Sequence, residues 1–369
     1  MNKLAALSIF AIFVTWHNPV VAQSATIQAQ INSACSTGGS INLPPIVTLT
    51  QTLNLRCPPG RIPVTLQGAP SQITCNTGAT PCIIVGSTVD TGANNTINLA
   101  IKDVHLIGPG RTVTGSEGVK IVPTADFAVL TDVGIDFFDL GLHLIGDAPL
   151  LVSVTGTNIK VGLLGASVNT SIHLDGEVAN AVFNNFVLSA QNRLILFDGP
   201  GGTGSNATFT NGVLNTTFTP GIASVYVGSS DGSVKGLQMG QISDWETACP
   251  YIQMGNSAAV WLNGISWNGD VQNSGSYPGI EMLPNTVSWL NIDNAGLSYC
   301  SGHGDIIKVE SANSTIRVVN SSFYLGTVNF VGQSRGTFIG NDCTTTGATL
   351  IGDLTRVRAS GNLGQCADR

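Results

Sequence analysis

Residues 142–147 read LHLIGD, residues 172–177 read IHLDGE and residues 195–199 read ILFDG. Each is a short β-rich segment that closes on glycine or a substitute, and the segment recurs every 20–30 residues. Ten copies end at residues 123, 146, 176, 199, 228, 255, 284, 311, 332 and 352. One such unit cannot bury its apolar side chains alone, whereas stacked units bury a continuous column. The repeat therefore predicts a coil of stacked short strands. A β-sandwich is the alternative, but it would not repeat one strand–glycine unit ten times.

The composition agrees with an all-β chain that has many tight turns. Of 369 residues, 44 are Gly, 43% are hydrophobic and only 10% are charged, which excludes a disordered chain and a coiled coil. The 15 Lys and Arg face 22 Asp and Glu, for a net charge of −7. No cluster of basic residues is visible along the sequence, so we expect no nucleic-acid partner.

The N-terminal segment predicts export. Lys3 precedes an apolar run over residues 4–15, and the small residues Val20 and Ala22 precede a cut before Gln23. We expect a signal peptide over residues 1–22, then a single β-helix domain over residues 23–369, in a secreted or periplasmic protein. No apolar run reaches the length of a membrane span.

The eight cysteines predict disulfides, because an even number in an exported chain is usually oxidised. Eight cysteines allow 105 pairings. Sequence spacing favours neighbours, namely Cys35–Cys57, Cys75–Cys82, Cys249–Cys300 and Cys343–Cys366.

The repeat, together with the start of the chain, resembles the right-handed parallel β-helix superfamily typified by pectate lyases and polygalacturonases. Residues 26–36 carry Ile27, Ile31 and Ala34 on one helical face, like the helix that caps the first coil in that superfamily. The strand-like segments over residues 41–58 and 64–75 follow it. The resemblance covers about residues 25–366 and implies an all-β, single-stranded right-handed parallel β-helix of about ten coils, with a short N-terminal capping helix.

One polar patch follows from the repeat. Side chains alternate along a strand, and the positions three and one before the closing glycine are expected to face outward. This count places Lys120, His143, His173, Asp175 and Asp198 on four consecutive rungs of one face. Rungs lie about 4.8 Å apart. A solvated face without function is the alternative, and a slip of one residue would invert the assignment.

The patch offers groups for polysaccharide chemistry. The two aspartates are expected at about the spacing of retaining glycosidases, and the histidines or Lys120 are candidate bases. These five residues are the catalytic candidates. Arg193, Asp147 and Glu177 are the substrate-binding candidates, with Arg111 nearby. The resemblance to pectate lyases implies calcium if the protein is a lyase. Otherwise no cofactor is expected, and no metal ligands are assigned.

The same count places four apolar residues outward, at Val225, Val227, Ile252 and Met254. An exposed apolar strip predicts a covering loop or a homo-oligomer. A second polar group comprises Glu281, Lys308 and Glu310, with Asp305 and His303 nearby. Residues 302–304 (GHG) match a short polygalacturonase motif whose companion motifs are absent from this sequence. Aromatic residues that could stack on sugars, or fill coil corners, concentrate after residue 240, at Trp245, Trp261, Trp267, Tyr277 and Trp289.

The sequence thus predicts a secreted β-helix protein that binds an extracellular polysaccharide or cleaves it as a lyase or hydrolase. The alternative is a non-catalytic adhesive, glycan-binding or structural surface protein. The sequence leaves open whether the protein is an enzyme.

Overall fold

The structure, a computed structural model, describes most of the chain from residue 20 onward. The described ranges are 20–58, 63–87, 98–122, 127–146, 152–200, 205–217, 219–267, 277–298, 300, 304–344 and 348–366.

One helix and 31 strands form the described chain. The helix is α1 (Val20–Thr37). A 12-stranded sheet, here called sheet B, contains β3 (Leu53–Cys57), β5 (Pro81–Ser87), β7 (Glu117–Ile121), β9 (Leu140–Gly146), β11 (Thr170–Gly176), β13 (Arg193–Asp198), β15 (Val225–Val227), β17 (Ile252–Met254), β20 (Ile280–Met282), β23 (Asp305–Val309), β26 (Thr327–Phe330) and β29 (Thr349–Gly352).

The second sheet, here called sheet A, has 19 strands. They are β1 (Gly39–Asn42), β2 (Ile46–Leu49), β4 (Val64–Cys75), β6 (Asn98–Ile107), β8 (Phe127–Asp136), β10 (Val152–Val161), β12 (Val178–Ser189), β14 (Ser205–Thr216), β16 (Lys235–Glu246), β18 (Ala258–Asn263), β19 (Ser266–Trp267), β21 (Trp289–Asp293), β22 (Gly296–Ser298), β24 (Thr315–Val319), β25 (Ser322–Tyr324), β27 (Arg335–Ile339), β28 (Asp342–Cys343), β30 (Val357–Ser360) and β31 (Leu363–Gly364).

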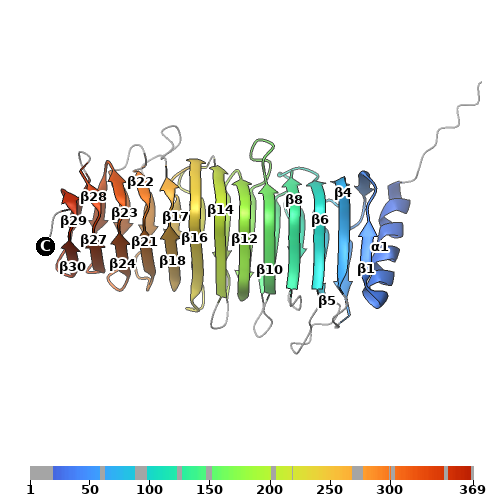
Figure 1. The fold of residues 1–369 in the computed structure, drawn as a ribbon, viewed down its shortest axis with the longest axis horizontal. Coiled ribbons are helices and arrows are strands. Elements are labelled where there is room, and N and C mark those ends of the chain that lie inside the picture. Colours follow the sequence, from blue (N-terminus) through green and yellow to red (C-terminus); the bar gives the residue numbers. More distant parts are fainter. Residues whose placement is uncertain are drawn as a thin grey trace, which may run out of the picture.

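The chain alternates between the two sheets and pairs in parallel with the coil before and the coil after. For example, β9 pairs with β7 and β11 in sheet B, while β10 pairs with β8 and β12 in sheet A. The result is a right-handed parallel β-helix of about ten coils, with the strands stacked along one long axis (Figure 1). The predicted fold class is confirmed. Among the described residues, no helix is both long enough and apolar enough to cross a membrane.

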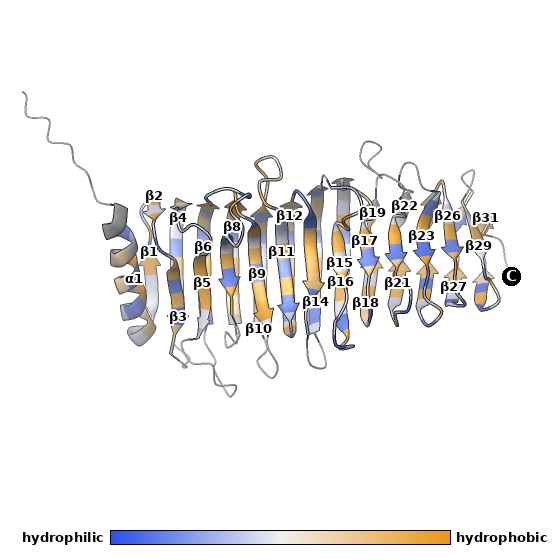
Figure 2. Cartoon of the chain, turned by 180° about the vertical axis from the view of Figure 1, so that it is seen from behind, coloured by the Kyte–Doolittle hydropathy of each residue, from blue (hydrophilic) through white to orange (hydrophobic). Residues whose placement is uncertain are grey.

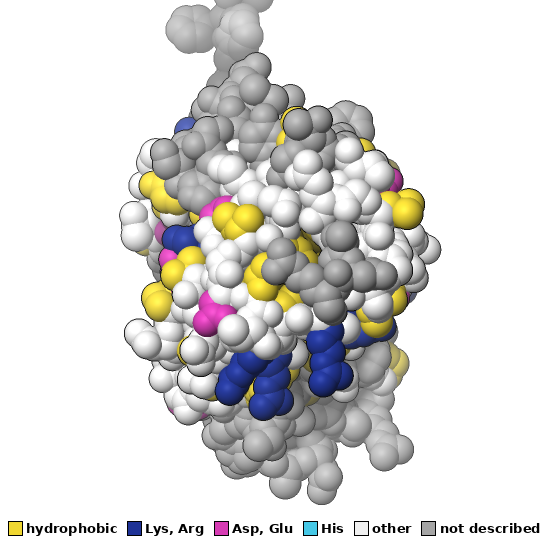
Figure 3. Space-filling view, turned by 90° about the vertical axis from the view of Figure 1, so that its left-hand side faces the viewer, with side chains coloured by type: hydrophobic (Ala, Val, Ile, Leu, Met, Phe, Trp, Pro, Cys, Tyr) yellow, Lys and Arg dark blue, Asp and Glu magenta, His cyan; other side chains and the backbone are white. Residues whose placement is uncertain are grey.

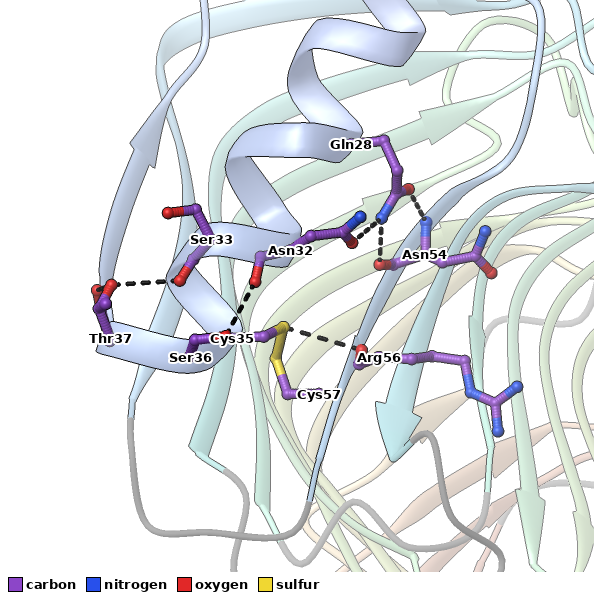
Figure 4. Close-up of a disulfide and its surroundings, with 10 residues drawn as sticks. Gln28, Asn32, Ser33, Cys35, Ser36, Thr37, Asn54, Arg56 and Cys57 are labelled. Atoms are coloured by element: carbon purple, nitrogen blue, oxygen red, sulfur yellow. Dashed lines mark hydrogen bonds between the residues drawn. A yellow bond between two sulfur atoms is a disulfide. The ribbon is translucent and has the colours of Figure 1, made fainter.

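α1 lies across the N-terminal end of the stack and covers the first coil (Figure 1). Its buried face consists of Ile27, Ile31 and Ala34, the residues that predicted a capping helix. Gln28 bonds to the backbone of Asn54 through both its amide nitrogen (3.0 Å) and its amide oxygen (2.8 Å). The Cys35–Cys57 disulfide joins the helix to β3 beside these bonds (Figure 4).

All four predicted disulfides are present: Cys35–Cys57, Cys75–Cys82, Cys249–Cys300 and Cys343–Cys366. Four disulfides are compatible with an extracellular or periplasmic protein. The predicted signal peptide falls almost entirely outside the described residues, so its cleavage site stays a prediction.

Sheet A bends at the same place in successive coils. At the bend a residue has positive φ, between 49° and 55° at Asp103, Asp132, Asn158, Asn185, Asn211, Gln241, Asn294 and Asn320. Asn and Asp tolerate this left-handed conformation better than other non-glycine residues. Glycine takes over at residues 264, 340 and 361, where φ is 64°. The abundance of Asn and Gly therefore serves a bend that recurs once per coil.

The core is a column of inward-facing side chains from both sheets. Leu142 and Leu144 on β9 stack on Ile172 and Leu174 on β11, and all four are fully buried. Bands of hydrophobic and hydrophilic residues accordingly alternate along many of the strands (Figure 2).

The predicted apolar outer face does not exist. Val225, Val227, Ile252 and Met254 are all fully buried in the core. Val225 pairs with Ile195, so the closing glycine of this coil comes one residue early relative to the core positions. Counting back from that glycine therefore assigned each side chain to the wrong face. Tyr226 and Gln253 occupy the outward positions instead, and these residues give no apolar surface for an oligomer.

Candidate functional site

The structure brings the five predicted catalytic residues together on the outer face of sheet B. Lys120 on β7 pairs with His143 on β9, which pairs with His173 on β11. Asp175 and Asp198 pair on the neighbouring strands β11 and β13. The strand register places all five within four rungs, as the sequence predicted.

The two histidines stack on each other. Their ring centroids lie 4.8 Å apart and the ring planes differ by 2°. His173 Nε2 lies 2.7 Å from Asp198 Oδ1, a short hydrogen bond between an imidazole and a carboxylate. The Asp198 side chain is 37% exposed and that of His173 is 19% exposed, so the pair can meet a ligand.

His143 is more deeply buried, between two carboxylates. Its Nδ1 atom lies 3.3 Å from Glu117 Oε2, and its Nε2 atom lies 3.9 Å from Asp175 Oδ2. Within the described part of the chain, neither ring nitrogen of His143 makes a hydrogen bond. Lys120 Nζ lies 3.3 Å from the other oxygen of Glu117. The site is therefore a row of alternating acidic and basic groups that contains one buried, incompletely bonded imidazole.

These contacts move pKa values in opposite directions. Burial of His143 lowers the pKa of its imidazole, but the interactions with Asp175 and Glu117 outweigh burial and raise that pKa above 6.5. The interaction with His143 lowers the pKa of Asp175. Burial raises the pKa of Glu117, but His143 and Lys120 lower it by more. His143 therefore holds its proton more readily than an ordinary imidazole, with carboxylates on both sides.

Two residues that the sequence analysis missed complete the site. Glu117 is the first residue of β7. A Cβ atom added to Gly118, the next residue, would lie only 2.6 Å from the carbonyl oxygen of Gly141, so the chain packs closely here. Lys235 lies at the start of β16 in sheet A and is fully buried. Its Nζ donates to the carbonyl oxygen of Gly176, next to Asp175.

Lys235 fits in the core because its neighbours are small. Ser205 and Ala258 pair with it on the adjacent strands, and its ammonium lies 5.5 Å from the centroid of the Phe197 ring. Burial lowers the pKa of Lys235, and nearby carboxylates, including Asp175 and Asp198, oppose that effect. A lysine between small residues at an inward position is the sequence signal that could have identified it.

Close packing also fixes Asp175. A Cβ atom on Gly199, which has a φ of +80°, would lie 2.1 Å from Asp175 Oδ1. Only glycine therefore leaves room for this carboxylate on the next rung.

Of the predicted substrate-binding residues that the structure describes, Arg193 extends toward the patch, and the others are held by the fold. Arg193 starts β13, and its guanidinium lies over the ring of Tyr226, which pairs with Leu196 two residues before Asp198. Burial lowers the pKa of Arg193, and its interaction with Asp198 partly offsets that effect. Glu177 is buried at the turn after β11. Arg111 donates to the carbonyl oxygen of Ala166. Asp147 lies outside the described residues.

The second polar group predicted from the sequence neutralises itself. Lys308 forms an ion pair with Glu310, and Gln253 donates to Glu281 at 2.8 Å. Asp305 is buried and accepts a hydrogen bond from Thr327. His303 lies outside the described residues, so the 302–304 motif has no described geometry.

A second His–Asp pair lies on sheet A, beside a hollow of about 350 Å³. His105 Nε2 lies 2.7 Å from Asp136 Oδ2. The other Asp136 oxygen accepts bonds from the Ser167 hydroxyl and the Leu164 N–H. One oxygen of this carboxylate therefore anchors the loop after β10, and the other holds His105 on β6.

The patch does not suit calcium. Ca²⁺ takes six to eight oxygen ligands, whereas imidazole nitrogens lie at the centre of this site. His143, His173 and Asp175 each offer a ligand atom within 4.8 Å of the others, a donor set of the kind that zinc uses. The imidazole planes are parallel, however, so their in-plane lone pairs do not converge on one ion. The arrangement suits proton transfer better than metal binding.

Two solved structures that share this architecture are an epimerase module and a tailspike protein. The A-module of the Azotobacter vinelandii mannuronan C-5 epimerase AlgE6 superposes with a TM-score of 0.62 and 14% identity, over 94% of this chain and 96% of that one. The Dettilon tailspike protein superposes with a TM-score of 0.58 and 10% identity, over 90% of this chain and 66% of that one. The chain has the parallel β-helix fold of these proteins. No protein-family model matches the sequence, and no curated protein matches it significantly.

Proposed function

We propose that this β-helix protein modifies an acidic polysaccharide by removing the proton at C5 of a uronate residue. The observation that carries this assignment is the His173–Asp198 hydrogen bond of 2.7 Å, stacked against a second imidazole of raised pKa. Asp198 would orient His173 and stabilise its cationic form, while the ring removes the proton.

The chemistry has two possible second steps. When the base takes the C5 proton, the C–H electron pair moves into the adjacent carboxylate and forms an enediolate. Return of a proton to C5 from the opposite face gives the epimer. Expulsion of the O4 substituent, with a proton delivered to that oxygen, gives an unsaturated sugar and breaks the chain. In the elimination, protonated His143 beside the base would deliver the proton to the departing oxygen. In the epimerisation, the proton would return from water on the open face of the sugar. Lys120 is a nearby cation for the developing negative charge in both.

Hydrolysis is less well supported. A glycosidase needs one carboxylic acid of raised pKa to protonate the leaving oxygen. The carboxyl groups of Asp175 and Glu117 instead have lowered pKa values, because basic groups surround them. The site is therefore richer in ionised carboxylates and imidazole than in carboxylic acid.

The structural neighbours support a polysaccharide partner. The name of the Azotobacter protein describes C-5 epimerisation of mannuronan, which is a reaction of the proposed class. At 14% identity this likeness concerns the fold, and the reaction is inferred from the side chains of sheet B.

The test uses oligomers of mannuronate and of galacturonate in D₂O, with and without added calcium. Deuterium at C5 without cleavage would identify an epimerase, and unsaturated products would identify a lyase. Either activity should disappear in His173→Ala and persist in His105→Ala, which changes the other His–Asp pair. New reducing ends without unsaturation, or binding without any turnover, would overturn the assignment in favour of a hydrolase or a non-catalytic glycan-binding protein.

A further inference from the structure

The C-terminal coils carry a second polar surface, on sheet A. Two columns of its outward positions cross five rungs, and the strand register fixes them. One column contains Trp289, Thr315, Arg335 and Arg356, and the other contains Trp261, Asn291, Arg317, Thr337 and Arg358. We call these nine residues the Arg–Trp face.

Positive charge is concentrated on this face although the whole protein is acidic. Four of the 15 lysines and arginines lie here, in a chain of net charge −7. All four arginines are exposed. Viewed from the C-terminal end, Lys and Arg side chains gather along one side of the molecule (Figure 3).

The arginines of this face form no close ion pairs with the described acidic side chains, although the charges of Arg356 and Asp353 interact. Among the residues that the structure describes, none of the four guanidinium groups lies within 4 Å of a carboxylate. Arg317 donates to the Asn291 side chain at 2.8 Å, and Asp353 accepts from Thr355. Arg335 and Arg356 occupy adjacent rungs, about 4.8 Å apart, where like charges repel. A ligand with negative charge would relieve this repulsion.

Two hollows and two tryptophans lie along the same face. A hollow of about 500 Å³ is lined by Arg335, Arg356 and Arg358. A second, of about 390 Å³, is lined by Trp261, Asn291 and Asp293 together with residues of the preceding coils, so negative charge is present at this end of the face and the arginines lie at the other. Trp261 and Trp289 are 40% and 42% exposed. Trp267, by contrast, is buried against Tyr251 and takes no part.

We infer that the Arg–Trp face binds an acidic polysaccharide, at a site separate from the patch on sheet B. The exposed indole rings offer flat apolar surfaces for sugar rings, and the arginines offer paired N–H donors for carboxylate or sulfate groups. The columns run along the solenoid axis, so an extended chain can lie across successive rungs. A nucleic acid would also meet the arginines, but the neighbouring Asn and Thr side chains and the four disulfides favour an extracellular glycan.

The test measures binding of mannuronate and galacturonate oligomers by calorimetry at several salt concentrations. Arg335→Gln/Arg358→Gln should weaken binding by about tenfold and reduce its salt dependence. Lys102→Gln/Lys160→Gln, which removes two charges from the N-terminal coils of the same sheet, should leave the affinity nearly unchanged. Trp261→Ala/Trp289→Ala should weaken binding without altering its salt dependence.

Failure of this inference is separable from failure of the proposed reaction. His173→Ala should lose turnover and keep the affinity of the Arg–Trp face. Equal losses in the Arg and Lys variants would show that binding responds only to net charge and would overturn the inference. Tighter binding of a DNA duplex of matched charge, insensitive to the Trp variant, would also overturn it in favour of a nucleic-acid surface.

Discussion

The two His–Asp pairs have the same length and different surroundings. His173–Asp198 and His105–Asp136 both join at 2.7 Å. The Asp136 side chain is 5% exposed and bonds to a hydroxyl and a backbone N–H, whereas the Asp198 side chain is 37% exposed. The comparison teaches that a short imidazole–carboxylate bond does not by itself indicate catalysis. What matters is whether the carboxylate is buried and bonded to groups that hold the fold together, or is exposed and able to meet a ligand.

The largest expected effect is a difference in turnover between variants of the two pairs. Asp198→Ala removes the group that orients His173, and turnover should fall by about 100- to 10,000-fold. Asp136→Ala should keep its specific activity per folded molecule. Initial rates on the active uronate oligomer, corrected for the folded fraction, measure both variants. A loss of activity that appears only in Asp136→Ala would assign the chemistry to sheet A.

The loss of stability should be larger for the pair on sheet A, the reverse of the order expected for activity. Asp136→Ala strands the Ser167 hydroxyl and the Leu164 N–H, and should lower the free energy of unfolding by about 3 kcal/mol. Asp198→Ala should change it by less than about 1 kcal/mol. Urea titration followed by circular dichroism gives both values. Similar losses in the two variants would show that the patch is as structural as the loop anchor.

The pH dependence of stability should sharpen the comparison further. The raised pKa of His143 stabilises the fold fully below about pH 6.5, and this contribution is lost as the pH rises through the folded-state pKa. The lowered pKa values of Asp175 and Glu117 stabilise the fold above about pH 4, and this contribution is lost as the pH falls through their folded-state values. Wild type should therefore lose stability above pH 6.5 more steeply than His143→Asn. Parallel curves would contradict the charge assignment.

The smallest expected effect concerns the buried lysine. Lys235→Met removes a cation that lowers the pKa of Asp175, so the acidic limb of the pH–rate profile should move to higher pH. Stability should be retained, because an apolar side chain of similar volume suits a buried position. Lys160→Met, on the exposed side of the same sheet, is the control and should leave the profile unchanged.

Much of the architecture could be predicted from the sequence, because each copy of the repeat corresponds to one coil of the solenoid. Counting back from the closing glycine placed Lys120, His143, His173, Asp175 and Asp198 correctly relative to one another. The count works here because β9, β11 and β13 stand in the same register relative to the glycines that follow their core residues. It failed where the glycine shifts by one residue, at Val225 and Ile252. Pairing of neighbouring cysteines succeeded because stacking brings nearby segments of the chain into contact.

The remaining site residues depend on contacts that spacing does not encode. Glu117 lies three residues before Lys120, outside the outward positions counted from the glycine, and joins the patch through its contacts with Lys120 and His143. Lys235 reaches the patch through the core from the other sheet. The arginines at 317, 335, 356 and 358 look scattered in the sequence and form a cluster only when the coils stack. A search for basic runs along the chain could therefore not find the Arg–Trp face.

The capped end of the solenoid also protects the strand edges of the first coil. α1 is synthesised before the strands that it covers, and Cys35–Cys57 ties it to the first coil. Each finished coil leaves one open strand edge per sheet, onto which the next coil adds. The helix therefore blocks, at one end of the stack, the strand edges that would otherwise be open to pairing with another chain.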